Sequence, residues 1–153
     1  MFYEDFEVGE EYTTEAFSFS IEQIIAFAQI YDPQPFHVDE EAAKTSIYGG
    51  LIASGWHVFS TAFGAVVRLG LFQGGGQGAG GFDEAHWSHP VRPGDTLRCT
   101  IKITHKRESR TRADRGYVHM HFAITNQHEQ VVAGFHCDQI FLKQSVNTVG
   151  GQL

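Results

Sequence analysis

Apolar residues in the first third of the chain recur at the spacing of a helix. Ser20 precedes this stretch and Gln23 follows Ser20 by three residues, which is the order of a capping box. One side of the stretch is then apolar, at Ile21, Ile24, Ile25 and Ala28. The pattern predicts an amphipathic helix that ends before Pro33.

The next segment, residues 32–37, contains two prolines that each bias the preceding residue away from helix. We therefore expect an irregular but stiff connection there. A short second helix should follow, with Asp39 as its N-cap and Glu40 and Glu41 in the first turn, where negative charge suits the helix dipole. This helix should end by Gly49.

A longer pattern covers residues 51–69, where apolar side chains occur almost all the way around a helix. Such a helix is normally buried on nearly every face. Its polar residues Ser54, His57 and Thr61 fall on one stripe, at spacings of three and four residues. This stripe needs partners within the fold or a ligand.

The remaining patterns predict extended structure and loops. Two short extended pieces, residues 1–6 and 11–19, should flank a turn at Gly9, and the glycine-rich residues 70–81 should form a flexible surface loop. Alternating apolar residues predict strands over 97–104 and 117–124, and a third long strand covers 131–142. An antiparallel sheet wrapped around one long, buried central helix, in an α+β fold, satisfies these patterns.

Length and composition fit a single domain over residues 1–153. The net charge of −7 argues against a protein that binds nucleic acid or anionic membranes through its overall field. Cys99 and Cys137 lie far apart and form no redox or zinc motif, so we expect them in the core. The acidic N-terminus does not resemble a secretory signal and no long apolar run occurs, which predicts a cytoplasmic location and no membrane contact.

The segment Tyr31–His37 is the first candidate for chemistry. Asp32 and His37 stand five residues apart in a proline-stiffened loop, so their side chains could converge on one water or substrate proton. A solvent-facing loop with an Asp turn residue is the alternative, and spacing alone favours it. The second candidate is Gly49–His57, whose small residues could present free backbone N–H groups to an oxyanion at a helix start. Close packing of helix against strand would explain the same residues.

Together these two segments resemble the MaoC-like dehydratase family, whose R-specific enoyl-CoA hydratases have the hot-dog fold. The family signature contains an Asp, a Pro, an apolar residue and a His, followed by a helix opened by small residues. The matching residues here are Asp32, Pro35, Phe36, His37 and Gly55. The resemblance continues through residues 89–97, 106–116 and 126–132, so it covers most of the chain.

The resemblance implies a hydro-lyase that reversibly hydrates trans-2-enoyl-CoA to (R)-3-hydroxyacyl-CoA. Asp32 and His37 would activate a water that adds to C3 and would deliver a proton to C2, while the Gly55 amide stabilises the enolate oxygen. Neither a metal nor an organic cofactor is implied. A homodimer is also implied, because a single hot-dog unit leaves a sheet edge and a helix face to cover.

Further residues could contact the acyl-CoA thioester substrate. Ser54 and Phe36 would line the site, and Tyr31, which replaces a Gly of the family signature, would narrow it. Gln34 replaces the usual Asn and could still form a local hydrogen bond. In the basic run at residues 106–115, Arg107, Arg110 and Arg112 either hold the phosphates of coenzyme A or belong to a solvated hairpin.

Two histidine pairs raise the question of a metal site, namely His86 with His89 and His119 with His121. Neither pair has a carboxylate or Cys in its segment to complete a ligand set, so we expect no metal. Two other functions stay open at this point. A hot-dog acyl-CoA thioesterase would direct its activated water at the carbonyl carbon, and a non-catalytic binding module would hold an acyl thioester without turnover.

Overall fold

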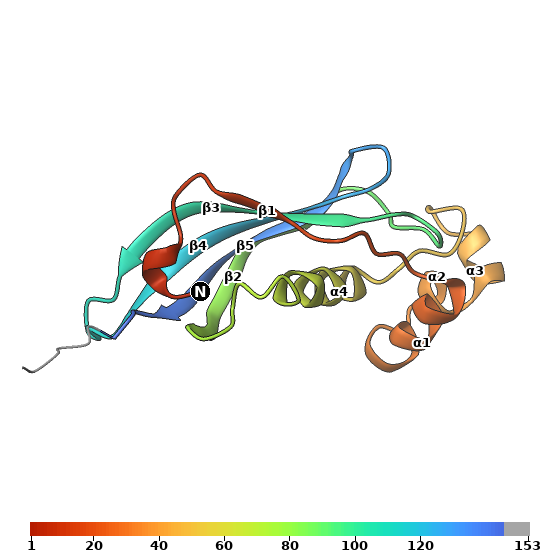
Figure 1. Ribbon diagram of the computed structural model, residues 1–153. Helices are drawn as coiled ribbons and strands as arrows, with labels where there is room; N and C mark the ends of the chain where they lie inside the picture. Colours follow the sequence, from red (N-terminus) through yellow and green to blue (C-terminus); the bar gives the residue numbers. More distant parts are fainter. Residues whose placement is uncertain (146–153) are drawn as a thin grey trace, which may run out of the picture.

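The structure is a computed structural model that describes residues 1–145. Figure 1 shows a curved antiparallel sheet with one long helix lying along its concave side and three shorter helices gathered at one end. The elements in chain order are η1 Tyr3–Asp5, β1 Glu11–Thr13, α1 Ile21–Tyr31, α2 Pro35–Val38, α3 Glu40–Lys44, α4 Gly55–Val67, β2 Gly76–Trp87, β3 Arg98–Glu108, β4 Arg115–Thr125 and β5 Val131–Leu142. The strands form one sheet in the order β1-β3-β4-β5-β2. This confirms the predicted α+β architecture of an antiparallel sheet around a central helix.

The core lies between α4 and the sheet. The predicted alternation in β3 and β4 is confirmed, because every second side chain is buried throughout β4 and over residues 98–103 of β3. Ile101 pairs with Phe122 and Cys99 with Ile124 in the antiparallel register, and all four are fully buried. Cys137 is also buried, so both cysteines are core thiols as expected. Within residues 1–145, no helix is long and apolar enough to cross a membrane.

Helix α4 is not buried on every face in a single chain, contrary to the expectation from its composition. Trp56, Phe63 and Val67 are 50%, 37% and 41% exposed, on the side of the helix that the sheet does not cover. The helix is also shorter than predicted, because residues 51–54 precede it without helical structure. Ala53 N–H donates to the Val91 carbonyl at 2.8 Å, which ties this segment to the chain beyond β2.

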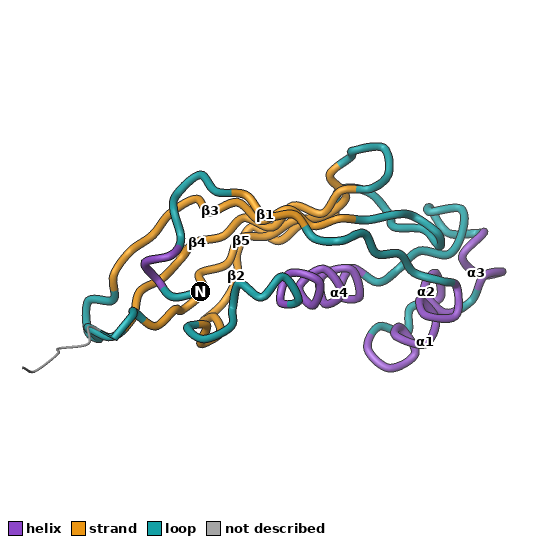
Figure 2. Tube along the Cα trace, viewed as in Figure 1, coloured by secondary structure: helices purple, strands orange, loops and turns teal. Residues whose placement is uncertain are grey.

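The predicted glycine-rich loop at residues 70–81 is the largest error of the sequence analysis. Residues 76–81 belong to strand β2, which pairs antiparallel with β5 at the edge of the sheet (Figure 2). Glycine is a poor strand former, but the backbone of β5 offers hydrogen bonds that the local sequence does not reveal. Several register shifts interrupt the pairing, and Gly78 adopts a positive φ of 84°. An irregular edge strand therefore replaces the expected loop.

The helical connections explain how the site residues are placed. The capping box of α1 is confirmed, because Ser20 Oγ accepts from Gln23 N–H at 3.1 Å and Gln23 Oε1 accepts from Ser20 N–H at 2.9 Å. Asp39 caps α3 as predicted. Residues 35–38 form a turn of helix rather than an irregular segment, since Pro35 at the first helical position has a suitable φ and needs no donor. Residues 1–6 likewise contain the 3₁₀ turn η1 instead of an extended piece.

Candidate active site

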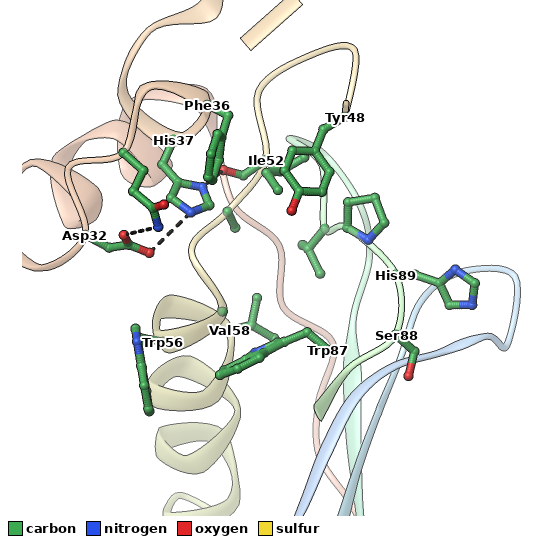
Figure 3. A pocket seen from close by; sticks show the side chains of 15 residues that line it. Asp32, Phe36, His37, Tyr48, Ile52, Trp56, Val58, Trp87, Ser88 and His89 are labelled. Atoms are coloured by element: carbon green, nitrogen blue, oxygen red, sulfur yellow. Dashed lines mark hydrogen bonds and ion pairs between the residues drawn. The ribbon is translucent and has the colours of Figure 1, made fainter. Parts of the chain in front are cut away.

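A cavity of about 440 Å³ opens where the C-terminal end of α1, the turn α2, the start of α4 and the end of β2 meet. Figure 3 shows Asp32 and His37 side by side on one wall, with Trp87 across the cavity over the start of α4. Gly55 and Phe36 also line the cavity. Asp32, Phe36, His37 and Gly55, which the sequence placed in two separate segments, therefore surround one space.

Asp32 follows the last turn of α1, where its N–H donates to the Ala28 carbonyl at 2.9 Å. Its carboxylate accepts from Gln34 Nε2 on Oδ1 at 2.7 Å and from Ser54 Oγ on Oδ2 at 2.7 Å. Burial by itself raises the pKa of Asp32, but the hydrogen bonds from Gln34 and Ser54 and the neighbouring His37 ring outweigh it and leave that pKa below its ordinary value. Asp32 is therefore a carboxylate at neutral pH, held at both oxygens.

His37 is buried on the short helix α2. Its Nδ1 lies 2.7 Å from the Ile52 carbonyl, which can only accept, so Nδ1 carries a proton. Its Nε2 lies 3.2 Å from Asp32 Oδ2. The ring is thus fixed in one orientation, and the proton that it gains or loses is the one on Nε2, facing the carboxylate and the cavity.

The N-terminus of α4 completes the cavity. Ser54 stands at the N-cap position, yet its hydroxyl does not cap the helix and instead donates to Asp32. The first backbone amides of this 13-residue helix therefore keep their donors free of a side-chain cap, at the positive end of the helix dipole. Such an end can hold an oxygen on which negative charge develops. No larger residue fits at position 55, because a Cβ on Gly55 would lie 2.3 Å from the Trp87 ring.

A family model described as "MaoC like domain" matches residues 5–121, well over half of the chain. The protein belongs to the MaoC-like dehydratase family. It is similar to the MaoC-like dehydratase from Rhodospirillum rubrum, with 36% identity and a TM-score of 0.87 over 94% of this chain and 98% of that one. The R-hydratase PhaJ1 from Pseudomonas aeruginosa shares the fold at 22% identity, with a TM-score of 0.71 over 94% of this chain and 86% of that one.

The uncharacterized protein YdeM from Bacillus subtilis (strain 168) is 30% identical over 109 residues, which cover 70% of this chain and 76% of that protein. The predicted hot-dog fold is confirmed, since the sheet wraps around α4 and the similar solved structures share this arrangement. The resemblance recognised from the Asp32–His37 segment is confirmed with it.

The predicted substrate-contacting residues do not all lie in the cavity of this MaoC-like protein. Phe36 lines it, and Ser54 is fully buried behind it, where it holds Asp32. Tyr31 does not line it, because its side chain is 68% exposed and packs on Phe27 with ring centroids 4.9 Å apart. Tyr31 therefore does not narrow the cavity. His57, from the polar stripe of α4, does not line the cavity either, and its ring packs against Phe19 and Phe27.

The basic run lies far from the cavity within one chain. Arg107 is at the end of β3, and Arg110 and Arg112 are in the following turn, at the end of the sheet opposite helices α1 to α3 (Figure 1). Arg107 contacts Asp138 at 3.6 Å and packs on the Tyr117 ring at 3.8 Å. None of the three lines the cavity beside Asp32 in the part of the chain that is described.

The histidine pair His119 and His121 contacts neighbouring side chains of the sheet. His119 Nδ1 bonds Asp138 Oδ1 at 2.7 Å, and the His121 ring stacks on His136 with centroids 4.4 Å apart. Residues 1–145 contain no group of three or more His, Cys, Asp or Glu side chains placed to hold a metal ion.

Sequence reasoning missed the residues that form the far wall of the cavity. Trp56 and Trp87 border it, together with Tyr48 and His89 near its opening. Trp56 could have been noticed, since it follows Gly55 at the start of the helix. Nothing in the sequence indicated that Trp87 lines the cavity, because only the unexpected pairing of β2 with β5 brings it against Gly55.

Proposed function

We propose that this protein reversibly hydrates trans-2-enoyl thioesters to (R)-3-hydroxyacyl thioesters. The observation that carries the proposal is that a buried Asp–His pair and the uncapped N-terminus of α4 border the same cavity. Hydration of a conjugated thioester needs these two elements, namely a group that exchanges a proton with water and a donor for the enolate oxygen. The MaoC-like family and its R-hydratase neighbour support the same reaction class.

In the proposed mechanism, a water in the cavity donates one hydrogen bond to Asp32 and faces Nε2 of His37. Nε2 takes a proton as the water oxygen bonds to C3, and the electrons of the double bond move to the thioester oxygen as an enolate. The imidazolium then returns the proton to C2, so one water is added and the pair is restored. Because the same pair handles both the water and the proton, both add to one face of the double bond.

Asp32 has a supporting role in this scheme. Its carboxylate orients the water and stabilises the imidazolium form of His37, at 3.2 Å. Gln34 and Ser54 hold the carboxylate in place and keep it ionised. The Ile52 carbonyl holds His37 through Nδ1, so the ring cannot turn its basic nitrogen away from the cavity.

The enolate oxygen would accept from the Gly55 amide at the start of α4. Removal of one such donor typically lowers kcat by about 10²- to 10³-fold in other enzymes. The absence of a side chain at Gly55 makes room for the Trp87 ring, which covers the surface next to this amide. Dehydration of the hydroxyacyl thioester would use the same groups in reverse.

A homodimer belongs to the same proposal. Strand β2 is exposed along almost its whole length at the sheet edge, and Trp56, Phe63 and Val67 on α4 are exposed beside it. A second copy paired at β2 would cover both features. The proposed contact of Arg107, Arg110 and Arg112 with coenzyme A would then have to come from a second copy, since these residues lie at the far end of the same chain.

The test is the loss of enoyl-thioester absorbance with crotonyl-CoA and longer trans-2-enoyl-CoAs. We expect turnover by the natural protein and a decrease of about 10²- to 10⁴-fold for Asp32→Asn and His37→Ala, the usual range for a general acid–base group. Glu11→Gln is the matched control, because Glu11 is an exposed carboxylate of β1 that is paired with Lys102 and does not line the cavity. Chiral analysis should show the (R) product.

Two other results would replace the proposal. Release of free thiol from a saturated acyl-CoA, lost in Asp32→Asn, would identify a thioesterase. Tight binding of acyl-CoA with neither reaction, unchanged in Asp32→Asn, would identify a non-catalytic binding module.

A further inference from the structure

Two indole side chains separate the active-site cavity from a second cavity. The second cavity has a volume of about 510 Å³ and lies between the exposed face of α4 and strand β2. Trp56 lines both cavities. We call Trp56 and Trp87 together the indole wall, since Figure 3 shows both rings beside the first turns of α4, below the Asp32–His37 pair.

The indole wall is a packed structure. The Trp87 ring stacks on Phe59 with centroids 4.7 Å apart and an interplanar angle of 26°, and Trp56 meets the Trp87 ring edge-on at 5.5 Å. Phe59 in turn lines the second cavity. Three aromatic rings therefore fill the space between the two cavities, and such pairs add about 0.5–1.5 kcal/mol each beyond their buried area.

The second cavity has the chemistry of an acyl-chain site. Its walls are Phe59 and Phe63 on α4, Phe82 on β2 and Phe135 on β5, with small residues along β2 at Gly78, Ala79 and Gly81. Neither Asp nor Glu, Lys, Arg or His lines it in the described part of the chain. Ser60, Cys137 and Gln139 complete the lining, so an aliphatic chain that reached this cavity would find mostly apolar partners and no charged group.

The position of Trp87 decides how far an acyl chain extends. A Cβ on Gly55 would lie only 2.3 Å from a carbon of the Trp87 ring. The indole therefore covers Gly55, the residue whose amide is proposed to hold the thioester oxygen. An acyl chain that extends from the carbonyl carbon toward α4 would therefore meet the indole wall beside Gly55.

We propose that the indole wall restricts the enzyme to short acyl chains, such as crotonyl and hexenoyl, by closing the path from the Asp32–His37 pair to the second cavity. This inference rests on the proposed function, because it takes the Gly55 amide as the site of the thioester oxygen. Trp56 and Trp87 are specificity-determining residues in this scheme, and neither takes part in proton transfer.

The expected effect follows from the burial of methylene groups. Burial of one CH₂ group stabilises the bound state by about 0.8 kcal/mol, which is about a fourfold change in affinity or kcat/KM. In the natural protein, kcat/KM should stop rising after hexenoyl-CoA and fall for octenoyl-CoA and dodecenoyl-CoA. With the indole wall opened, the two extra methylenes of octenoyl-CoA should instead raise kcat/KM about 15-fold over hexenoyl-CoA.

The experiment measures kcat/KM over the series crotonyl-, hexenoyl-, octenoyl- and dodecenoyl-CoA for the natural protein and for Trp56→Ala and Trp87→Phe. Trp56 is half exposed on a helix, so Trp56→Ala should fold, and Trp87→Phe keeps an aromatic ring against Phe59. Val67→Ala is the matched control, because Val67 is an exposed apolar residue of α4 that lines neither cavity. We expect the preferred length to increase in both Trp variants and to stay short in Val67→Ala.

A binding measurement keeps this test separate from the proposed reaction. Calorimetry with hexanoyl-, octanoyl- and dodecanoyl-CoA on the Asp32→Asn variant, with and without Trp56→Ala, reports the chain-length limit without turnover. A limit that shifts on Trp56→Ala, while the natural protein hydrates none of the enoyl-CoAs, supports the indole wall and refutes the proposed reaction. The inference would be overturned if the natural protein preferred long chains, if the Trp variants left the chain-length limit unchanged, or if no acyl-CoA bound.

Discussion

The hydroxyl of Ser54 offers a quantitative test of how the site holds its carboxylate. Ser54 is fully buried, and its Oγ donates to Asp32 Oδ2 at 2.7 Å. A hydrogen bond to a charged group contributes about 1.5–3 kcal/mol, against about 1 kcal/mol for a neutral one. Ser54→Ala should therefore lower the free energy of unfolding by about 1.5–3 kcal/mol at pH 7, where Asp32 is ionised.

The same bond predicts how this loss depends on pH. The pKa of Asp32 is lowered from 3.8 in the folded protein, against the opposing effect of burial, by the hydrogen bonds from Gln34 and Ser54 and by His37. A lowered carboxyl pKa gives stability that is present above the unfolded value and disappears as the pH falls through the folded value. The difference between the natural protein and Ser54→Ala should thus shrink toward about 1 kcal/mol as the pH falls below 3.8 and through the lower folded pKa of Asp32.

Urea denaturation at pH 7 and at an acid pH where Asp32 is protonated in the folded protein measures both quantities, and the pH dependence of kcat/KM supplies a second readout. The acid limb of the activity profile should move to higher pH in Ser54→Ala, because the carboxylate has lost a donor. Thr61→Ala removes a hydroxyl from the same helix that has no bond to Asp32, and it should move neither the limb nor the pH-dependent part of stability. An equal loss of stability at both pH values, with an unmoved acid limb, would refute the reasoning.

Three further predictions concern other parts of the molecule. Gly55→Ala should lower kcat/KM at least tenfold and destabilise by about 1–3 kcal/mol, measured by thermal denaturation, because its Cβ would overlap the Trp87 ring; unchanged values would place that ring elsewhere. Burial lowers the pKa of His57 below 6.5, so the free energy of unfolding should decrease as the pH falls through 6.5. His57→Phe should make this decrease smaller in urea titrations at pH 8 and pH 5. An identical decrease in the variant would show that His57 is protonated in the folded protein. Phe63→Asp should convert the expected dimer to a monomer in sedimentation experiments, and a dimer that persists would place the interface away from α4.

The elements that sequence reasoning placed well are those fixed by neighbours along the chain. Helix α1 is closed by reciprocal hydrogen bonds between Ser20 and Gln23, and α3 is capped by Asp39, so the signal for each lies within three residues of the helix start. The strands β3 and β4 were readable because one face of each is buried and the other exposed, which sets a period of two.

The sequence did not predict strand β2, for the opposite reason. Its glycines carry no apolar alternation, and all but the first of its residues are exposed, so no local pattern distinguishes it from a loop. Pairing with β5, whose partner residues lie 46 (Trp87 with Ala133) to 65 (Gly76 with Phe141) positions later, supplies the hydrogen bonds that make it a strand. The sequence also did not predict that one face of α4 is exposed. Strand β2 beside this face is an edge strand, so Trp56 and Phe63 are left for a partner to cover.

The residues of the candidate active site likewise differ in whether local or distant contacts position them. Residues 52–55 perform three tasks in sequence: the Ile52 carbonyl fixes His37, the Ser54 hydroxyl fixes Asp32, and Gly55 begins the helix whose amides face the cavity. Two short segments, 32–37 and 52–55, therefore contain all the residues proposed for proton transfer, and this is why a motif could point to them. The indole wall joins residue 56 to residue 87 through strand β2, which the sequence did not predict. The proposed reaction class can accordingly be inferred from a motif, whereas the proposed limit on acyl-chain length depends on a contact that only the folded chain reveals.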